Sequence, residues 1–316
     1  MSFDNLGLSP AIKHNLHGLG YRVPTPVQAK AIPLALEGRD VIGSAQTGTG
    51  KTAAFGLPMI ERLVLRANAT PLKPRQPRAL VLTPTRELAL QVNESLVGFS
   101  RKTGLRSVAI FGGVGMQPQI DALKRCVHIV VATPGRLIDH MEQRNVDLSA
   151  VEILTVDEAD RMMDMGFLPP LRRILGALPK RRQTLLFSAT FPEPIRALAV
   201  KFMINPAEVQ AAAPNSAAAT VSHRVHRVHH DRKRDLLVHL LKQNGDQTLV
   251  FCRTKRGPTA FAGISRHRAS VPRQFMETKA RAQELRLFAI SSWAKPTSWW
   301  PRTSQPAVSI SSNFRW

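Results

Sequence analysis

A twelve-residue stretch, residues 41–52, constrains the fold more than any other part of the sequence. It reads VIGSAQTGTGKT, so an apolar pair precedes a loop with Gly48 and Gly50, and a helical run follows Thr52. Glycines in such a loop let backbone N–H groups turn inward at a helix N-terminus, where they bind phosphate. The order of strand, glycine loop and helix predicts a nucleotide-phosphate site; the alternative is an ordinary turn before a helix.

The side chains of this stretch predict how the nucleotide is held. Lys51 is placed to reach the β- and γ-phosphates, and the Thr52 hydroxyl is placed to bind Mg²⁺. The first loop position is Ala45, where this kind of loop usually has glycine. The residues expected to bind the cofactor are Ala45, Gln46, Thr47, Gly48, Thr49, Gly50, Lys51 and Thr52.

The charge of the chain indicates a polyanionic partner. Its 316 residues hold 44 Lys and Arg against 22 Asp and Glu, a formal net charge of +22. Residues 1–210 carry +9 of this excess, and the shorter stretch 211–316 carries +13. We interpret the excess as favouring nucleic acid; the alternative is a solvated surface.

The few cysteines and the apolar runs limit where such a protein is expected. Cys126 and Cys252 lie far apart in apolar runs, which favours reduced thiols in the cytoplasm. The first residues do not resemble a signal peptide, and no apolar run reaches the ~18 residues of a membrane span.

Beyond residue 41 short apolar runs alternate with helical patterns. Strands are predicted at 79–82, 107–111, 128–132, 152–156 and 184–187, and helices at 86–101, 117–124, 135–142, 168–178 and 193–202. This alternation predicts an α/β domain, residues 41–210, with a parallel sheet and helices on both faces. Functional residues of such sheets lie at the carboxyl ends of the strands.

Polar residues follow several of these predicted strands. Asp157 and Glu158 come after one of them, where a carboxylate can hold Mg²⁺ and its neighbour can polarise water; the alternative is an acidic turn that caps the next helix. Turns at 83–88, 112–113 and 132–136 contain hydroxyls, exposed N–H groups and Arg. These groups suit contacts with a phosphate backbone, although plain turn chemistry would use the same residue types.

The segment before residue 41 contains a second feature of the predicted nucleotide site. Prolines and Thr25 precede a helix that carries Gln28. A Gln amide offers one acceptor and two donors, which suits the edges of adenine. A capped helix start without a ligand is the alternative.

Taken in order, these signatures resemble the first RecA-like, P-loop domain of a DEAD-box RNA helicase, nearest the bacterial RhlE-like group, over residues 3–204. The resemblance implies ATP and Mg²⁺ as cofactors, an Ala at position 45, stacking of Phe3 on adenine, and readout of adenine by Gln28. It implies that Lys51, Asp157 and Glu158 are catalytic and that Thr52 and Asp157 hold the metal. It also implies that Asp160, Ser188 and Thr190 couple ATP to domain closure, and that Thr85, Arg86, Gly113, Thr133 and Arg136 line the RNA path.

The resemblance changes after residue 206. An Ala-rich linker is predicted at 211–220, and residues 221–257 resemble the start of a second RecA-like domain, with an edge strand at 221–229, a helix at 232–242 and a strand near 248–255. The Ala-Arg-Gly-x-Asp and His-Arg-x-Gly-Arg-x-Gly-Arg motifs of such a domain are absent, and residues 258–316 read as an aberrant, disordered basic tail. We expect a frameshift between about residues 258 and 275; a lineage-specific extension is the alternative.

The family function implied by the resemblance is ATP-dependent unwinding of RNA duplexes through sequence-independent backbone contacts, with ribosome-assembly or RNA-decay factors as partners. An incomplete second RecA-like domain would lack the arginine finger on which phosphoryl transfer depends. Two alternatives therefore remain: a remnant that binds ATP and RNA without turnover, and a fragment that competes with an intact helicase for protein partners.

Overall fold

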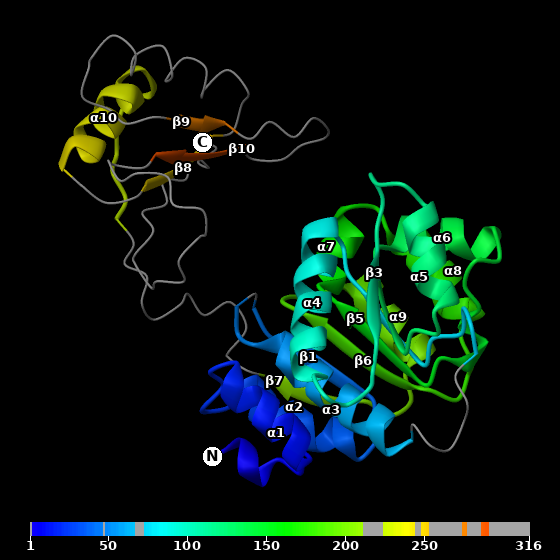
Figure 1. Ribbon diagram of the computed structural model, residues 1–316. Coiled ribbons are helices and arrows are strands. Elements are labelled where there is room, and N and C mark those ends of the chain that lie inside the picture. The colour runs from blue at the N-terminus through cyan, green and yellow to red at the C-terminus, as the bar shows by residue number, and fades with distance from the viewer. Residues whose placement is uncertain are drawn as a thin grey trace. The chain divides into compact units, whose positions relative to one another are not determined.

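The computed structural model describes residues 2–46, 48–66, 73–210, 224–243, 248–252, 274–276 and 286–290. The chain forms two compact units, Met1–Pro214 and Asn215–Trp316 (Figure 1). Among the described residues no helix is long and apolar enough to cross a membrane.

The first unit is built on a parallel sheet with the order β3-β4-β2-β5-β6-β1-β7. Its strands are β1 (Val41–Ser44), β2 (Ala79–Leu82), β3 (Ser107–Ile110), β4 (Ile129–Ala132), β5 (Ile153–Asp157), β6 (Gln183–Ser188) and β7 (Ala207–Gln210). Because all described pairs are parallel, the carboxyl ends of the strands share one edge and the amino ends share the other. The predicted parallel sheet is confirmed.

Helices cover both faces of this sheet. They are α1 (Pro10–Gly18), α2 (Pro26–Leu36), α3 (Lys51–Leu65), α4 (Arg86–Phe99), α5 (Gln117–Lys124), α6 (Pro134–Glu142), α7 (Ala159–Asp164), α8 (Leu168–Ala177) and α9 (Glu193–Phe202). Each face of the sheet has its own apolar cluster. On one face Val81, Val131 and Leu185 pack with helices α1–α4, and on the other Leu80, Val130 and Leu186 pack with helices α5–α9. Successive strand residues point to opposite faces, so the central strands β2, β4, β5 and β6 are buried from both sides, whereas the edge strands β3 and β7 are more exposed.

Helices α4 and α6 begin within a few residues of the ends of β2 and β4, because polar and proline residues stop the preceding strand. Thr85 is the N-cap of α4, and its hydroxyl accepts a hydrogen bond from the Leu88 N–H at 3.2 Å. Thr133 is the N-cap of α6 and is followed by Pro134, a residue suited to the first helical position. These short connections bring helix N-termini to the carboxyl edge of the sheet.

Strand β7 was not predicted from the sequence. Asp40 fixes its position, because the Asp40 carboxylate accepts the N–H groups of Thr184 and Ile204, each at 2.7 Å. The Asp40 carbonyl also accepts the Ala207 N–H at 2.8 Å, at the start of β7. A carboxylate that is only 6% exposed therefore joins β6 to the segment that enters β7.

The second unit contains η3 (His230–Arg232), α10 (Lys233–Gln243) and three antiparallel strands in the order β8-β10-β9: β8 (Thr248–Cys252), β9 (Gln274–Met276) and β10 (Arg286–Ile290). The predicted helix at 232–242 agrees with α10. The prediction of an edge strand at 221–229 is wrong for residues 224–229, which form no strand and pair with none of the described strands. Residues 211–223, including the predicted linker, lie outside the described residues, as does the segment 258–316 except for β9 and β10.

Candidate nucleotide and nucleic-acid site

The glycine loop between β1 and α3 has the backbone that its sequence requires. Gly48 and Gly50 have φ angles of 86° and 88°, in the left-handed region that favours glycine. Gly50 is the N-cap of α3, so the N-terminus of a 15-residue helix faces the loop. Within the loop, Thr49 donates through its N–H and its hydroxyl to the Gln46 carbonyl. Thr47 lies outside the described residues.

Gln28 lies directly against this loop. Its side-chain Nε2 donates to the Gly50 carbonyl at 3.0 Å, and its Oε1 accepts the Thr25 N–H at 2.9 Å. A Cβ added to Gly50 would collide with Gln28 Nε2, so the amide would have to move, and the φ of 88° favours glycine there in any case. These bonds leave the amide one N–H and one oxygen lone pair, enough for the adenine contact predicted for Gln28.

Lys51 and Asp157 form the charged centre of the site. Lys51 begins α3, Asp157 ends β5, and Lys51 Nζ lies 3.8 Å from Asp157 Oδ1. Both residues are buried, at 6% and 2% exposure, and both atoms lack a hydrogen-bond partner among the described residues. Burial raises the pKa of Asp157 to about 6; Lys51 opposes the rise and Glu158 adds to it. A buried ammonium without a hydrogen-bond partner suits a phosphate, and a buried carboxylate without one suits Mg²⁺. A phosphate with bound Mg²⁺ would therefore supply partners for both Lys51 and Asp157.

Glu158 follows in a strained backbone conformation. Its φ of 54° and ψ of 53° are left-handed, an unusual region for a residue with a side chain. Although Glu158 is the N-cap of α7, its side chain makes no capping hydrogen bond; it accepts one from Arg161 Nη1 at 3.1 Å. The alternative reading of Glu158 as a helix cap is therefore not supported by its contacts.

Ser188 connects the glycine loop to the segment after β5. Its carbonyl accepts the Ala45 N–H at 3.1 Å, and its hydroxyl accepts the Asp160 N–H at 3.1 Å. Asp160 Oδ2 accepts both the N–H and the hydroxyl of Thr190, each at 2.9 Å. Burial favours a higher pKa for Asp160, but hydrogen bonds from Thr190 and Ser188 outweigh it and lower that pKa. The three residues predicted to couple ATP to domain closure are thus in direct contact.

The residues predicted to line an RNA path lie along the carboxyl edge. Arg86 is exposed, and its guanidinium carbon lies 5.1 Å from the centre of the Phe111 ring. Gly113, with φ of 81°, is exposed in the turn after β3 and close to Arg86, since its added Cβ would lie 4.0 Å from Arg86 Nη1. Thr85 and Thr133 are the N-caps of their helices, and Thr133 is buried.

Arg136 has a structural role that the sequence did not reveal. Its Nη1 and Nη2 donate to the Val114 carbonyl at 3.0 and 3.1 Å, and its Nε lies 3.5 Å from Asp139 Oδ2. The neighbouring residue Gln119 donates to the Phe111 carbonyl at 3.0 Å and is itself bonded to the buried His140 at 3.1 Å. Arg136 and Gln119 therefore hold both ends of the 111–114 turn that carries Gly113.

Phe3 occupies a different position from the one its predicted role requires. It is 4% exposed, and its ring packs edge-to-face on Tyr21 with the ring centres 6.3 Å apart. Tyr21 packs in the same way on Phe99. The predicted stacking of Phe3 on adenine would require the ring to leave this core, so its position does not support that role.

Taken together, the parallel sheet, the glycine loop at a helix N-terminus and the buried Lys51–Asp157 pair define a P-loop nucleotide-binding protein. Comparison with known proteins specifies the family. The model of the DEAD/DEAH box helicase family matches residues 25–198, more than half of the chain. The chain belongs to the DEAD/DEAH box helicase family.

Individual relatives agree with this assignment. The chain is 43% identical over 256 residues to the DEAD-box ATP-dependent RNA helicase CshA of Geobacillus kaustophilus, covering 81% of this chain and 53% of that protein. It is 44% identical over 255 residues to the ATP-dependent RNA helicase CshA of Listeria monocytogenes, covering 80% and 48%. A crystal structure of a DEAD box protein from Methanococcus jannaschii matches with a TM-score of 0.62 and 37% identity, over 84% of this chain and 70% of that one. The chain spans about half the length of the curated relatives it matches.

Proposed function

We propose that this chain binds ATP and RNA and uses ATP hydrolysis to separate short RNA duplexes. The observation that carries the proposal is the buried Lys51–Asp157 pair, whose facing atoms lack hydrogen-bond partners among the described residues beside the glycine loop. A buried polar group without a partner is costly, and a magnesium-bound triphosphate is a ligand that would satisfy both charges at once.

In this proposal Lys51 and the N–H groups of residues 46–51 hold the phosphates, and Thr52 and Asp157 hold Mg²⁺. The metal, when bound, neutralises charge on the transferred phosphoryl group. Glu158 orients the attacking water and accepts its proton, a role that suits a carboxylate 6% exposed directly after β5. Gln28 uses its remaining donor and acceptor to select adenine, while Phe3 supports the site from the core.

The RNA strand in this proposal follows the carboxyl edge past Thr85, Arg86, Gly113 and Thr133. Arg86 is exposed and offers a cation to a phosphate, and the turn at Gly113 offers backbone N–H groups. Arg136 acts by holding that turn through the Val114 carbonyl. Such contacts are made with the backbone, so we expect little sequence preference.

Coupling between the two ligands passes through Ser188, which is bonded both to Ala45 of the glycine loop and to Asp160. Asp160 holds Thr190, which is exposed and available to a second domain.

The experiment is RNA-stimulated release of phosphate by the full chain. We expect stimulation to be lost in Lys51→Ala and in Glu158→Gln, with ATP still bound by Glu158→Gln. Lys30→Ala is the matched control, because Lys30 is exposed on α2 and its described hydrogen bond is to the Gln210 carbonyl. Absence of release at every RNA concentration, together with ATP binding, would instead favour the remnant that binds both ligands without turnover.

Two finer proposals concern the rest of the chain. We propose that residues after about 258 are read in a neighbouring frame, because their composition changes and all four Trp lie at 293–316. The alignment with the Geobacillus relative leaves about a fifth of the chain unmatched, a share close to that of residues 258–316. Translating the gene in the other frames tests this: an Ala-Arg-Gly-Leu-Asp stretch is expected.

We also propose that the protein acts in the cytoplasm, a location supported by the free thiol of Cys126. Assignment to the RhlE-like group stays a prediction, since the relatives described above are named CshA. Retention of an intact helicase by this chain, resistant to nuclease and high salt, would favour the competing-fragment alternative.

A further inference from the structure

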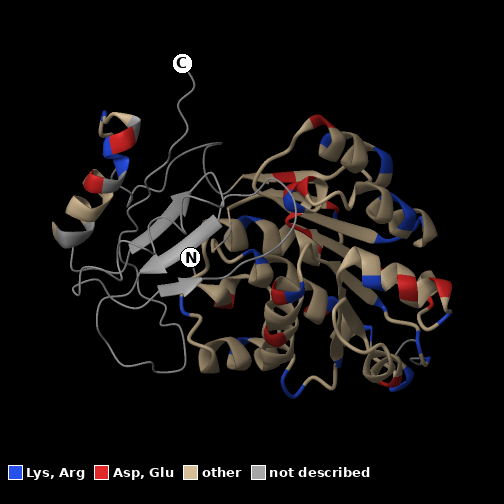
Figure 2. Cartoon of the chain, turned by 90° about the horizontal axis from the view of Figure 1, so that it is seen from above, with Lys and Arg blue, Asp and Glu red and all other residues tan. Residues whose placement is uncertain are grey.

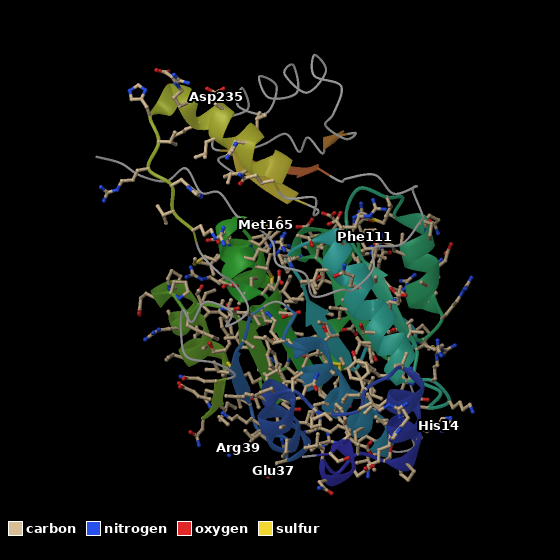
Figure 3. All side chains as sticks on the ribbon, turned by 90° about the vertical axis from the view of Figure 1, so that its left-hand side faces the viewer. His14, Glu37, Arg39, Phe111, Met165 and Asp235 are labelled. Atoms are coloured by element: carbon tan, nitrogen blue, oxygen red, sulfur yellow. The ribbon has the colours of Figure 1, made fainter. Side chains whose placement is uncertain are left out.

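The two edges of the parallel sheet differ sharply in charge. The connections that enter the seven strands of the first unit contain thirteen Lys and Arg and four Asp and Glu. The connections that leave the strands for the following helices contain no Lys or Arg and one acidic residue, Glu158. Figure 3 places labelled residues at the two ends: Phe111, after β3, lies at the opposite end of the unit from Glu37 and Arg39, before β1. We call the end with Arg39 the amino edge.

The four acidic residues of the amino edge offset only part of its positive charge; Glu37 is exposed, and the other three bind groups of the fold. Asp40 accepts two backbone N–H groups, and Glu152 is paired with Arg66 and Arg78 at 3.0 and 2.6 Å. Asp147 accepts the Ser149 N–H at 2.9 Å. The positive charge of this edge also acts on His128, the residue before β4: burial lowers the pKa of His128, and the charges of Arg106 and Arg78 lower it further.

The remaining cations are exposed and available. Those that are exposed and in no ion pair with another described residue include Arg39, Arg101, Lys102, Arg125, Lys180 and Arg181. They precede β1, β3, β4 and β6, so in the sheet order they extend from β3 to β1. Five steps between neighbouring strands correspond to a width of about 24 Å. Figure 2 shows Lys and Arg on several loops of the unit.

We propose that the amino edge is a second RNA-binding surface, which holds a double-stranded segment by its phosphates. The seven entering connections contain no Phe, Tyr or Trp. Single-stranded nucleic acid is usually held by stacking on aromatic residues, and protein partners are usually anchored by aromatic hot spots. A broad array of cations without aromatic residues instead suits a duplex, which is recognised by its shape and its phosphates.

The inference rests on the proposed function only for the identity of the polyanion. The amino edge is separate from the residues that hold ATP, so its occupancy requires no nucleotide. If the amino edge holds one double-stranded segment of a structured RNA, a second short duplex of the same RNA stays at high local concentration near the carboxyl edge.

The test compares two triple variants of equal charge in the full chain. The edge variant replaces three cations of the amino edge: Arg39→Gln, Lys102→Gln and Arg181→Gln. The control variant replaces three exposed cations on helices α2, α8 and α9: Lys30→Gln, Arg172→Gln and Arg196→Gln. Binding of a labelled blunt RNA duplex of about 16 base pairs is measured by fluorescence anisotropy without nucleotide. We expect the edge variant to bind at least about tenfold more weakly at 0.1 M salt, with a log–log salt slope lower by about 2–3. The control is expected to stay within about twofold, because its charges lie elsewhere.

A second measurement separates this surface from the basic residues after 210. Acetylation of lysines with and without the duplex should show protection of Lys102 and Lys180 and none of Lys30. Equal binding by the two variants, or equal acetylation of Lys102 with and without duplex, would overturn the inference. Equal protection by single-stranded RNA, or protection only by an acidic polypeptide, would also overturn it. ADP binding, unchanged in the edge variant, shows that the nucleotide site is intact and keeps this outcome separate from a failure of the proposed function.

Discussion

Replacing Asp157 by Asn should stabilise the nucleotide-free protein, although the same change should abolish magnesium-dependent binding. Asp157 is 2% exposed, and burial raises its pKa to about 6 from the ordinary 3.8. Because the pKa is higher in the folded state, this group contributes stability that is fully present below pH 3.8 and is lost as the pH rises through about 6. At about 1.36 kcal/mol per pKa unit, the loss approaches about 3 kcal/mol at pH 8.

The amide of Asn resembles the protonated carboxyl in size and in its lack of charge. The attraction of Lys51 is already contained in the pKa of Asp157, since Lys51 lowers it. We therefore expect the Asn variant to exceed the wild type in free energy of unfolding by about 1–3 kcal/mol at pH 8. At pH 4 the two proteins should be nearly equal, because the wild-type carboxyl is then protonated.

The assay must report the first unit specifically. All four Trp lie at 293–316, so Trp fluorescence does not follow this unit. Urea unfolding is better combined with hydrogen exchange of the β5 and β6 amides. Asp164→Asn is the matched control, because Asp164 is an exposed carboxylate on α7. A variant less stable than the wild type at pH 8, or an equal difference at both pH values, would refute the reasoning. With excess Mg·ADP the order should reverse, since only the wild type gains from the ligand.

Three further predictions concern the same site. Gly50→Ala should weaken ADP binding at least about tenfold by calorimetry, because its φ is 88° and its Cβ would collide with Gln28, whereas Gly176→Ala has open space and should not. Phe3→Ala should lower the free energy of unfolding by about 3–5 kcal/mol, because it truncates a core side chain. Phe3→Leu should keep ADP affinity within about twofold. If Phe3→Leu lost ADP affinity with unchanged stability, stacking of Phe3 on adenine would be supported. Thr190→Val should leave RNA-stimulated phosphate release within about threefold but reduce unwinding about tenfold, since it removes one of two bonds to Asp160; equal losses in both assays would contradict a coupling role.

The sequence predicted the architecture well because its signals are local. Apolar runs of four to six residues alternate with capped helices. Strand β2 and helices α5 and α9 therefore match the predicted bounds, and the other helices and strands predicted at residues 86–202 differ by one or two residues at an end. Strand β7 was missed because only Val209 of its four residues is buried. Its place in the sheet depends on Asp40, which lies more than 160 residues earlier in the chain and could not be linked to it by pattern.

The site was predictable by residue type but not by contact. The glycine loop and the Asp157-Glu158 pair were recognised because phosphate and metal chemistry fix both residue type and spacing. The double bond from Arg136 to the Val114 carbonyl depends on how two turns meet in space, which no spacing reveals. The burial of Phe3 was missed for the same reason, since an aromatic residue before a helix suits a core as well as a base; its stacking on adenine stays a prediction.

The distribution of charge implies that the two edges should respond differently to salt. At the carboxyl edge the proposed phosphate site combines one buried cation, Lys51, with backbone N–H groups and a helix N-terminus. Such partly buried interactions are weakly screened. The amino edge instead relies on exposed side chains, whose attraction for a polyanion falls steeply as salt rises. ADP binding should therefore change little between 50 and 200 mM salt, on the order of a few-fold, while duplex binding falls by at least about tenfold. Parallel salt dependence of the two ligands would mean that both are held by the same exposed charges, and the division between the edges would then be wrong.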